Sequence, residues 1–155
     1  MKNVILCGFP CSGKDTVGAV LKGKGLVPVA FGEMLKNVCG SIRSRDYISV
    51  AEFMVRNFQL QPREAFDKIE EYSQIPRYDV KDRILLQTLG TDFRKMKNDI
   101  WTAPIKNIII SNPLLRFVIT DCRRHFELEE FNDCFKVYVE AADDVIYKTL
   151  KQRDG

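Results

Sequence analysis

Residues Gly8–Thr16 read GFPCSGKDT, and they follow the apolar run VILC at positions 4–7. Gly8, Gly13 and Lys14 match the G-x-x-x-x-G-K spacing of a phosphate-binding loop. In that loop the glycines allow a tight turn, the backbone N–H groups point inward, and the lysine reaches the phosphates. The stretch therefore predicts a buried strand, an anion-binding turn and then a helix.

Asp15 stands where the common loop has serine or threonine, and Thr16 follows it. An acid in the first turn of a helix is stabilised by the helix dipole. A carboxylate that faces a triphosphate is repelled unless a cation lies between them. Asp15 therefore either points away from the ligand or helps to hold Mg²⁺ through water, because Mg²⁺ keeps several of its waters.

The composition is that of a single globular domain without a highly charged partner. The chain has 155 residues and a net charge of +3, with Lys and Arg scattered along it, so we expect no nucleic-acid partner. No apolar run reaches the roughly 18–20 residues that a membrane span needs. The five cysteines include no C-x-x-C pair, which favours free thiols in a reducing cytoplasm over a metal site.

The order of elements predicts an α/β fold. We expect strands at 2–7, 27–31, 116–121 and 135–140, and helices at 16–22, from 32, at 49–58, 62–72, 80–89, 99–109, 126–131 and 143–153. Ser49 and Asp99 are candidate N-caps, Pro62 suits a first helical position, and Gly90 is expected to end a helix. Alternating strands and helices imply a parallel sheet covered on both faces, in three α/β/α layers. The helical segment at about 41–80 is an insert in one domain, 1–155.

Two motifs resemble one family of enzymes. Ser12–Thr16 (SGKDT), and Leu89–Asp92 (LGTD) followed by Asp99–Trp101 (DIW), resemble the bacteriophage-type deoxynucleoside monophosphate kinases. These are P-loop nucleotide kinases similar to adenylate kinase. The resemblance implies a P-loop NTPase fold and ATP-dependent phosphorylation of a deoxynucleoside monophosphate to the diphosphate. It also implies ATP and Mg²⁺ as cofactors, nucleotides as small-molecule partners, and a monomer or homodimer.

Other functions stay open. Animal phosphomevalonate kinases share the SGKD motif, and they have a D-x-R-R motif similar to Asp121–Arg124 (DCRR) of this chain. The alternative is therefore another small-phosphate kinase, for phosphomevalonate or dephospho-coenzyme A. A nucleotide-binding protein without turnover is a further one. The sequence contains no [NT]-K-x-D motif for guanine, which argues against a GTPase switch.

The resemblance distributes roles over three parts of the chain. The expected ATP-binding residues are Gly8, Cys11, Ser12, Gly13, Lys14, Asp15 and Thr16. Lys36, in Phe31–Lys36 (FGEMLK), is expected to meet the acceptor phosphate, although a solvated helix lysine fits equally well. The other expected acceptor-binding residues are Gln87, Thr91, Asp92, Trp101, Asp121 and Arg123. Trp101 is also a natural core residue.

The end of the third predicted strand adds charge to the site. Asp121 follows Phe117–Thr120 (FVIT), where open α/β sheets bind ligands. We expect it either to hold Mg²⁺ through water, the role also considered for Asp15, or to orient the acceptor. The Arg123 guanidinium can bind phosphate through two parallel hydrogen bonds. We expect Arg123, Lys14 and Arg153 to be the catalytic residues. Leu150–Gly155 resembles the start of an arginine-bearing lid. The family continues beyond such a lid, so we expect the C-terminal lid and the last strand to be missing.

Overall fold

The computed structural model describes residues 2–154 and divides the chain into two compact units. One, here called the sheet unit, comprises residues 1–31 and 104–155. The other, the helical unit, comprises residues 32–103 and contains the helical segment expected at 41–80. Each unit is described by itself.

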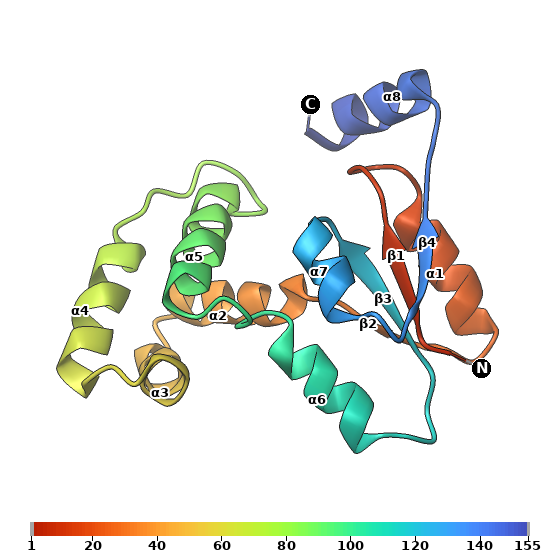
Figure 1. The fold of residues 1–155 in the computed structure, drawn as a ribbon. Helices are drawn as coiled ribbons and strands as arrows, with labels where there is room; N and C mark the ends of the chain where they lie inside the picture. The colour runs from red at the N-terminus through yellow and green to blue at the C-terminus, as the bar shows by residue number, and fades with distance from the viewer. Residues whose placement is uncertain (1, 155) are drawn as a thin grey trace. The chain divides into compact units, whose positions relative to one another are not determined.

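The sheet unit is built on four parallel strands (Figure 1). They are β1 (Val4–Cys7), β2 (Val27–Val29), β3 (Phe117–Cys122) and β4 (Phe135–Tyr138), in the order β2-β3-β1-β4. The central pair, β1 and β3, aligns Val4 with Val118 and Cys7 with Cys122. Burial on both faces explains why both strands read as continuous apolar runs, and it confirms the expected parallel α/β sheet.

Helices cover this sheet on both faces, an arrangement compatible with a three-layer α/β/α fold (Figure 1). The sheet unit contains α1 (Lys14–Gly23), α6 (Ala103–Ser111, which starts at the unit boundary), α7 (His125–Glu130) and α8 (Asp143–Asp154). On one face, Val17 and Leu21 of α1 pack on Leu6 and Val118. The ring of Phe31, which follows β2, lies 5.5 Å from the ring of Phe131, which follows α7.

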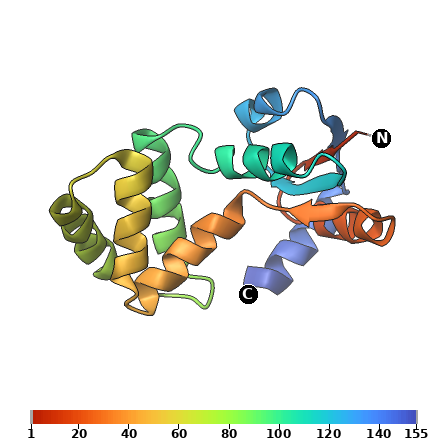
Figure 2. The ribbon, with the colours of Figure 1, turned by 90° about the horizontal axis from the view of Figure 1, so that it is seen from below.

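The helical unit contains four helices that pack against one another (Figure 2). They are α2 (Gly32–Arg43), α3 (Tyr47–Phe58), α4 (Pro62–Ser73) and α5 (Arg83–Met96). Aromatic side chains form part of its core. Fully buried Phe93 lies at the centre, with its ring 4.9 Å from Phe58 and 5.8 Å from Trp101, on which it stacks. Pro62 is the first residue of α4, as expected from its fixed φ angle.

Two predicted helix starts were wrong. Helix α3 begins at Tyr47, and its N-cap is Asp46, whose carboxylate accepts a hydrogen bond from the Ser49 N–H at 3.3 Å. Ser49 is thus inside the first turn, because the stronger cap precedes it by three residues. Helix α6 begins at Ala103, since the backbone around Asp99 forms a turn that accepts the Ala103 N–H at 2.8 Å.

Gly90 does not end a helix, contrary to expectation. Helix α5 starts at Arg83, later than predicted, and runs on through Gly90 to Met96. Its buried face, Leu85, Leu89 and Phe93, keeps a four-residue spacing across the glycine, so packing outweighs the weak helix propensity of that residue. The predicted strand at 27–31 is also shorter, ending at Val29.

Within residues 2–154, no helix has the length and apolar character that crossing a lipid bilayer demands.

Candidate functional site

The loop between β1 and α1 has a backbone that only certain residues tolerate (Figure 1). Gly8 has a φ of 144° and Gly13 a φ of 96°, both in the left-handed region, and Cys11 has a φ of 61°. A Cβ atom on Gly8 would lie 2.2 Å from the carbonyl oxygen of Val139, whereas one on Gly13 would meet open space. Gly8 is therefore required by close packing as well as by its backbone conformation.

Lys14 is the first residue of α1, and its side chain folds back over this loop. It is 8% exposed, and its ammonium donates hydrogen bonds to the carbonyl oxygens of Gly8 at 2.8 Å and Phe9 at 2.6 Å. Burial, and after it the positive charge of Arg123, lowers the pKa of Lys14 from its ordinary value. The carbonyl contacts hold the ammonium at the loop without neutralising it.

The two residues just before this lysine leave polar groups without a hydrogen-bond partner. The Ser12 side chain is 4% exposed, and its hydroxyl is buried without a hydrogen-bond partner. The N-cap of α1 is Gly13, which provides no side-chain cap for the first N–H groups of the helix. A buried hydroxyl without a partner costs free energy, so an oxygen-rich ligand at this position would satisfy groups that the chain leaves unpaired.

The topology of the sheet brings a second positive charge to the same edge. The carboxyl ends of β1 and β3 are adjacent, with Cys7 aligned with Cys122, so Arg123 follows directly beside the start of the loop. From β1 the chain crosses to β2, beyond β3, whereas from β3 it crosses to β4, beyond β1. Connections that leave adjacent strands in opposite directions open a crevice, where sheets of this kind bind ligands.

Glu127 fixes the start of the segment after β3, a role that the sequence analysis missed. Its buried carboxylate accepts the backbone N–H of Arg123 at 2.8 Å and that of Arg124 at 3.0 Å. The acid at the third position of α7 was a readable capping signal. Because these bonds involve the Arg123 backbone, they leave its exposed side chain available to a ligand.

The expected metal-binding residues lie on these same two segments. Asp15 and Thr16 are exposed in the first turn of α1. Asp121 accepts the Phe31 N–H through Oδ1 at 2.8 Å, so part of its role is to hold the segment that follows β2. Within residues 2–154 no three His, Cys, Asp or Glu side chains gather as metal ligands. A magnesium ion held mainly by phosphate oxygens and water needs only one or two carboxylates, so the residues fit that role.

The expected acceptor-binding residues lie in the helical unit, apart from Asp121 and Arg123. Lys36 is exposed on α2, and Gln87 and Thr91 are exposed one turn apart on α5. They therefore occupy surface positions from which a ligand can be contacted.

The other two acceptor candidates of the helical unit have partners within it. Asp92 accepts a hydrogen bond from the Tyr72 hydroxyl at 3.3 Å and lies 3.7 Å from the Lys95 ammonium. Burial, and then the Asp92 charge, raises the pKa of Tyr72. Trp101 is 4% exposed, and its Nε1 donates to the Gly90 carbonyl at 3.3 Å. These contacts give both residues structural roles within the helical unit. Their contact with an acceptor stays a prediction.

Arg153 falls within α8, but its side chain lies outside the described residues. Its expected catalytic role, and the missing lid, stay predictions.

Comparison of the chain with protein-family models and with curated proteins finds no match.

Proposed function

We propose that this chain is a P-loop kinase that transfers the γ-phosphoryl group of ATP to a deoxynucleoside monophosphate. The observation that carries the proposal is the set of donors at the carboxyl ends of β1 and β3. It combines the buried Lys14 ammonium, the unpartnered Ser12 hydroxyl, the uncapped start of α1 and the neighbouring Arg123. Such a set attracts a polyphosphate, because every unsatisfied group in it is cationic or can donate a hydrogen bond.

Phosphoryl transfer requires the protein to position the two substrates and to supply positive charge around the transferred group. The loop amides and Lys14 hold the phosphates of ATP, and Arg123 offsets negative charge on the group in transfer. Mg²⁺, when bound, would supply further charge compensation for the phosphates, and Asp15 is the residue of this loop that would hold it through water. An acceptor phosphate oxygen forms the new bond to the γ-phosphorus while the bond to the β-phosphate oxygen breaks, releasing ADP. The attacking oxygen is already anionic, so no general base is required.

The choice of acceptor rests on the resemblance of Leu89–Asp92 and Asp99–Trp101 to deoxynucleoside monophosphate kinases. A coupled assay of ADP release tests it with dGMP, dTMP, dCMP and dAMP, and with phosphomevalonate and dephospho-coenzyme A. We expect at least one deoxynucleotide to stimulate release. Stimulation by one of the other two acceptors alone would reassign the substrate. Thermal protection by ATP without any release would indicate a binding protein.

Lys14→Ala tests the assignment of the loop, with Lys22→Ala as its control on the exposed side of the same helix. We expect Lys14→Ala to abolish ADP release and to weaken thermal protection by ATP, because the ammonium that reaches the phosphates is lost. Lys22→Ala should retain both. Unchanged turnover in Lys14→Ala would show that the loop does not bind the donor nucleotide in the proposed way.

A further inference from the structure

The helical unit contains a small pocket between α2 and the segment that leads into α5. Its volume is about 210 Å³. The residues that line it are Lys36, Cys39, Gly40, Arg43, Arg77, Val80, Lys81, Asp82 and Leu86. Lys36, Gly40 and Arg43 recur on one face of α2, at the spacing that puts helix residues side by side. The remaining charged groups come from residues 77–82, so the pocket exists only in the folded unit.

The lining is strongly basic. It carries four cations, Lys36, Arg43, Arg77 and Lys81, against one acid, Asp82. Asp82 is 6% exposed and is paired with Arg43: the Nε–Oδ2 distance is 2.5 Å and the Nη2–Oδ1 distance is 3.0 Å. One cation is thus neutralised inside the pocket, and three remain for an anionic ligand.

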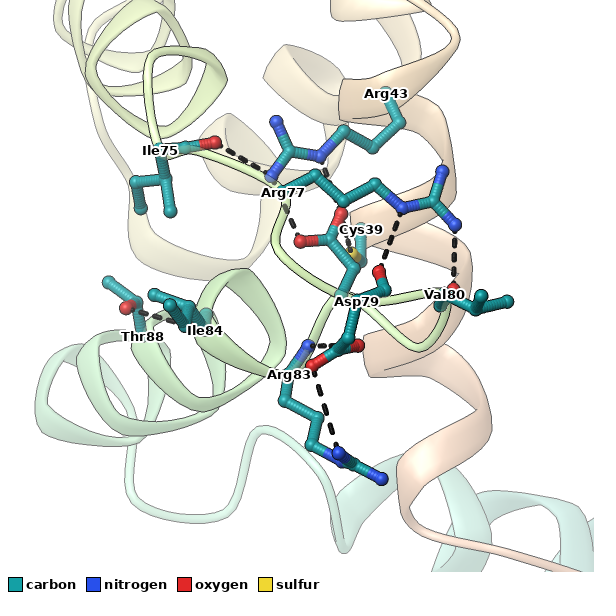
Figure 3. Close-up of polar contacts among 10 residues, drawn as sticks. Cys39, Arg43, Ile75, Arg77, Asp79, Val80, Arg83, Ile84 and Thr88 are labelled. Carbon is teal, nitrogen blue, oxygen red and sulfur yellow. Dashed lines mark hydrogen bonds and ion pairs between the residues drawn. The ribbon is translucent and has the colours of Figure 1, made fainter. Parts of the chain in front are cut away.

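Arg77 is held at this pocket by neutral groups. Its Nε donates to the Asp79 carbonyl at 3.1 Å, and its Nη2 donates to the Val80 carbonyl at 2.6 Å (Figure 3). These bonds orient the guanidinium and leave its charge in place. The Asp79 carboxylate faces Arg83 instead, at 3.8 Å. Among the described residues, no carboxylate lies within ion-pair distance of Arg77, Lys36 or Lys81.

Arg43 and Asp82 fix the shape of the pocket. Arg43 also donates through Nη2 to the Ile75 carbonyl at 2.8 Å, so it joins α2 both to the chain after α4 and to the start of α5. Asp82 has a φ of 54°, a left-handed conformation, and its carboxylate accepts a hydrogen bond from the Cys39 thiol at 3.8 Å. The hydrogen bond from Arg43 lowers the pKa of Asp82. The ion pair therefore holds α2 against the start of α5, and the two residues position the lining of the pocket.

We propose that this pocket binds the dianionic phosphate of a phosphomonoester, with Lys36, Arg77 and Lys81 as the contacting cations. The volume is below the roughly 300–1,000 Å³ of pockets that enclose a drug-sized ligand. It suits a phosphate group and the atoms attached to it, with the rest of the molecule outside. Identifying the ligand as the acceptor nucleotide rests on the proposed kinase function, whereas phosphate binding does not. Arg77 and Lys81 then join Lys36 as acceptor-binding residues.

Calorimetric titration without ATP tests the pocket with three probes: a deoxynucleoside monophosphate, the matching deoxynucleoside and inorganic phosphate. We expect the monophosphate to bind and the deoxynucleoside not to bind, because the pocket recognises the phosphate. Binding of inorganic phosphate as tightly as the monophosphate would identify free phosphate as the ligand and still support the site. If the wild-type protein binds neither phosphate probe, or binds the deoxynucleoside equally well, the proposal is wrong.

Arg77→Gln and Lys81→Gln locate the binding, with Arg63→Gln and Lys68→Gln on α4 as controls that remove the same charges elsewhere in this unit. Each pocket variant should raise the dissociation constant for the monophosphate about tenfold, because a charge-assisted hydrogen bond is lost. The controls should stay within about twofold of wild type. The Lys81 side chain is exposed and makes no hydrogen bond or ion pair within residues 2–154, so its replacement tests the site without endangering folding. Equal weakening in control and pocket variants would overturn the inference.

ADP release separates this inference from the proposed function. If an acceptor stimulates ADP release but its KM is unchanged in Arg77→Gln and Lys81→Gln, the kinase proposal stands and the pocket does not bind the acceptor. If no acceptor stimulates release while phosphate binding still falls in those variants alone, the pocket proposal stands and the kinase proposal is wrong.

Discussion

Replacing Arg43 by methionine removes the basic half of the buried pair with Asp82 and leaves the carboxylate in place. The lost contacts are two hydrogen bonds to Asp82 and one to the Ile75 carbonyl. Removing one partner of a buried ion pair costs about 3–5 kcal/mol. We expect about 3 kcal/mol, at the lower end, because the Arg43 side chain is 23% exposed and the Arg77 charge still acts on Asp82.

Urea unfolding followed by Trp101 fluorescence measures this loss. Trp101 is the only tryptophan of the chain and is buried in the same unit as Arg43. With a urea dependence of about 2 kcal/mol per molar, the unfolding midpoint should fall by about 1.5 M. Arg63→Met, on the exposed side of α4, is the control and should leave the midpoint unchanged within error.

The pH dependence of this loss has a definite sign. The folded-state pKa of Asp82 is lowered from its ordinary value of 3.8, so the pair stabilises the fold above that pH and loses its effect as the pH falls further. The stability difference between wild type and Arg43→Met should therefore shrink below about pH 4. Adding Asp82→Asn to Arg43→Met should recover part of the lost stability at neutral pH, because the unpaired charge is gone. An unchanged midpoint in Arg43→Met, or no recovery in the double variant, would refute the reasoning.

Two further predictions concern the loop after β1. Ser12→Ala should leave the ligand-free protein equally or more stable, because it removes a buried unpartnered hydroxyl, and it should reduce the rise in melting temperature that ATP produces. A lower ligand-free melting temperature with an unchanged ATP effect would give Ser12 a structural role instead. Gly8→Ala should destabilise the fold more than Gly13→Ala, because both have positive φ angles but only the first meets a backbone oxygen. Equal urea midpoints for the two variants would contradict the packing argument.

Local patterns predicted the elements well where burial repeats regularly. The apolar runs at 4–7 and 117–120 form the central strands, and the glycines flanking the loop adopt positive φ angles. Errors fell at the ends of helices and strands. Gly90 reads as a helix end but lies inside α5, because the buried face continues to Phe93. Whether a weak helix former ends a helix depends on what packs against it, and the local sequence does not contain that information.

The sequence by itself determined the α/β class and the phosphate-loop pattern, because strand and helix periodicity and glycine conformation are properties of neighbouring residues. Only the tertiary structure decided that the Arg123 charge helps to lower the pKa of Lys14. The same holds for the burial of the Ser12 hydroxyl without a partner and for the continuation of α5 past its glycine. The tertiary structure also decided that cations from α2 and from residues 77–82 line one pocket. Each of these facts joins residues that are distant in the chain or depends on burial, and both are set by the way the elements pack.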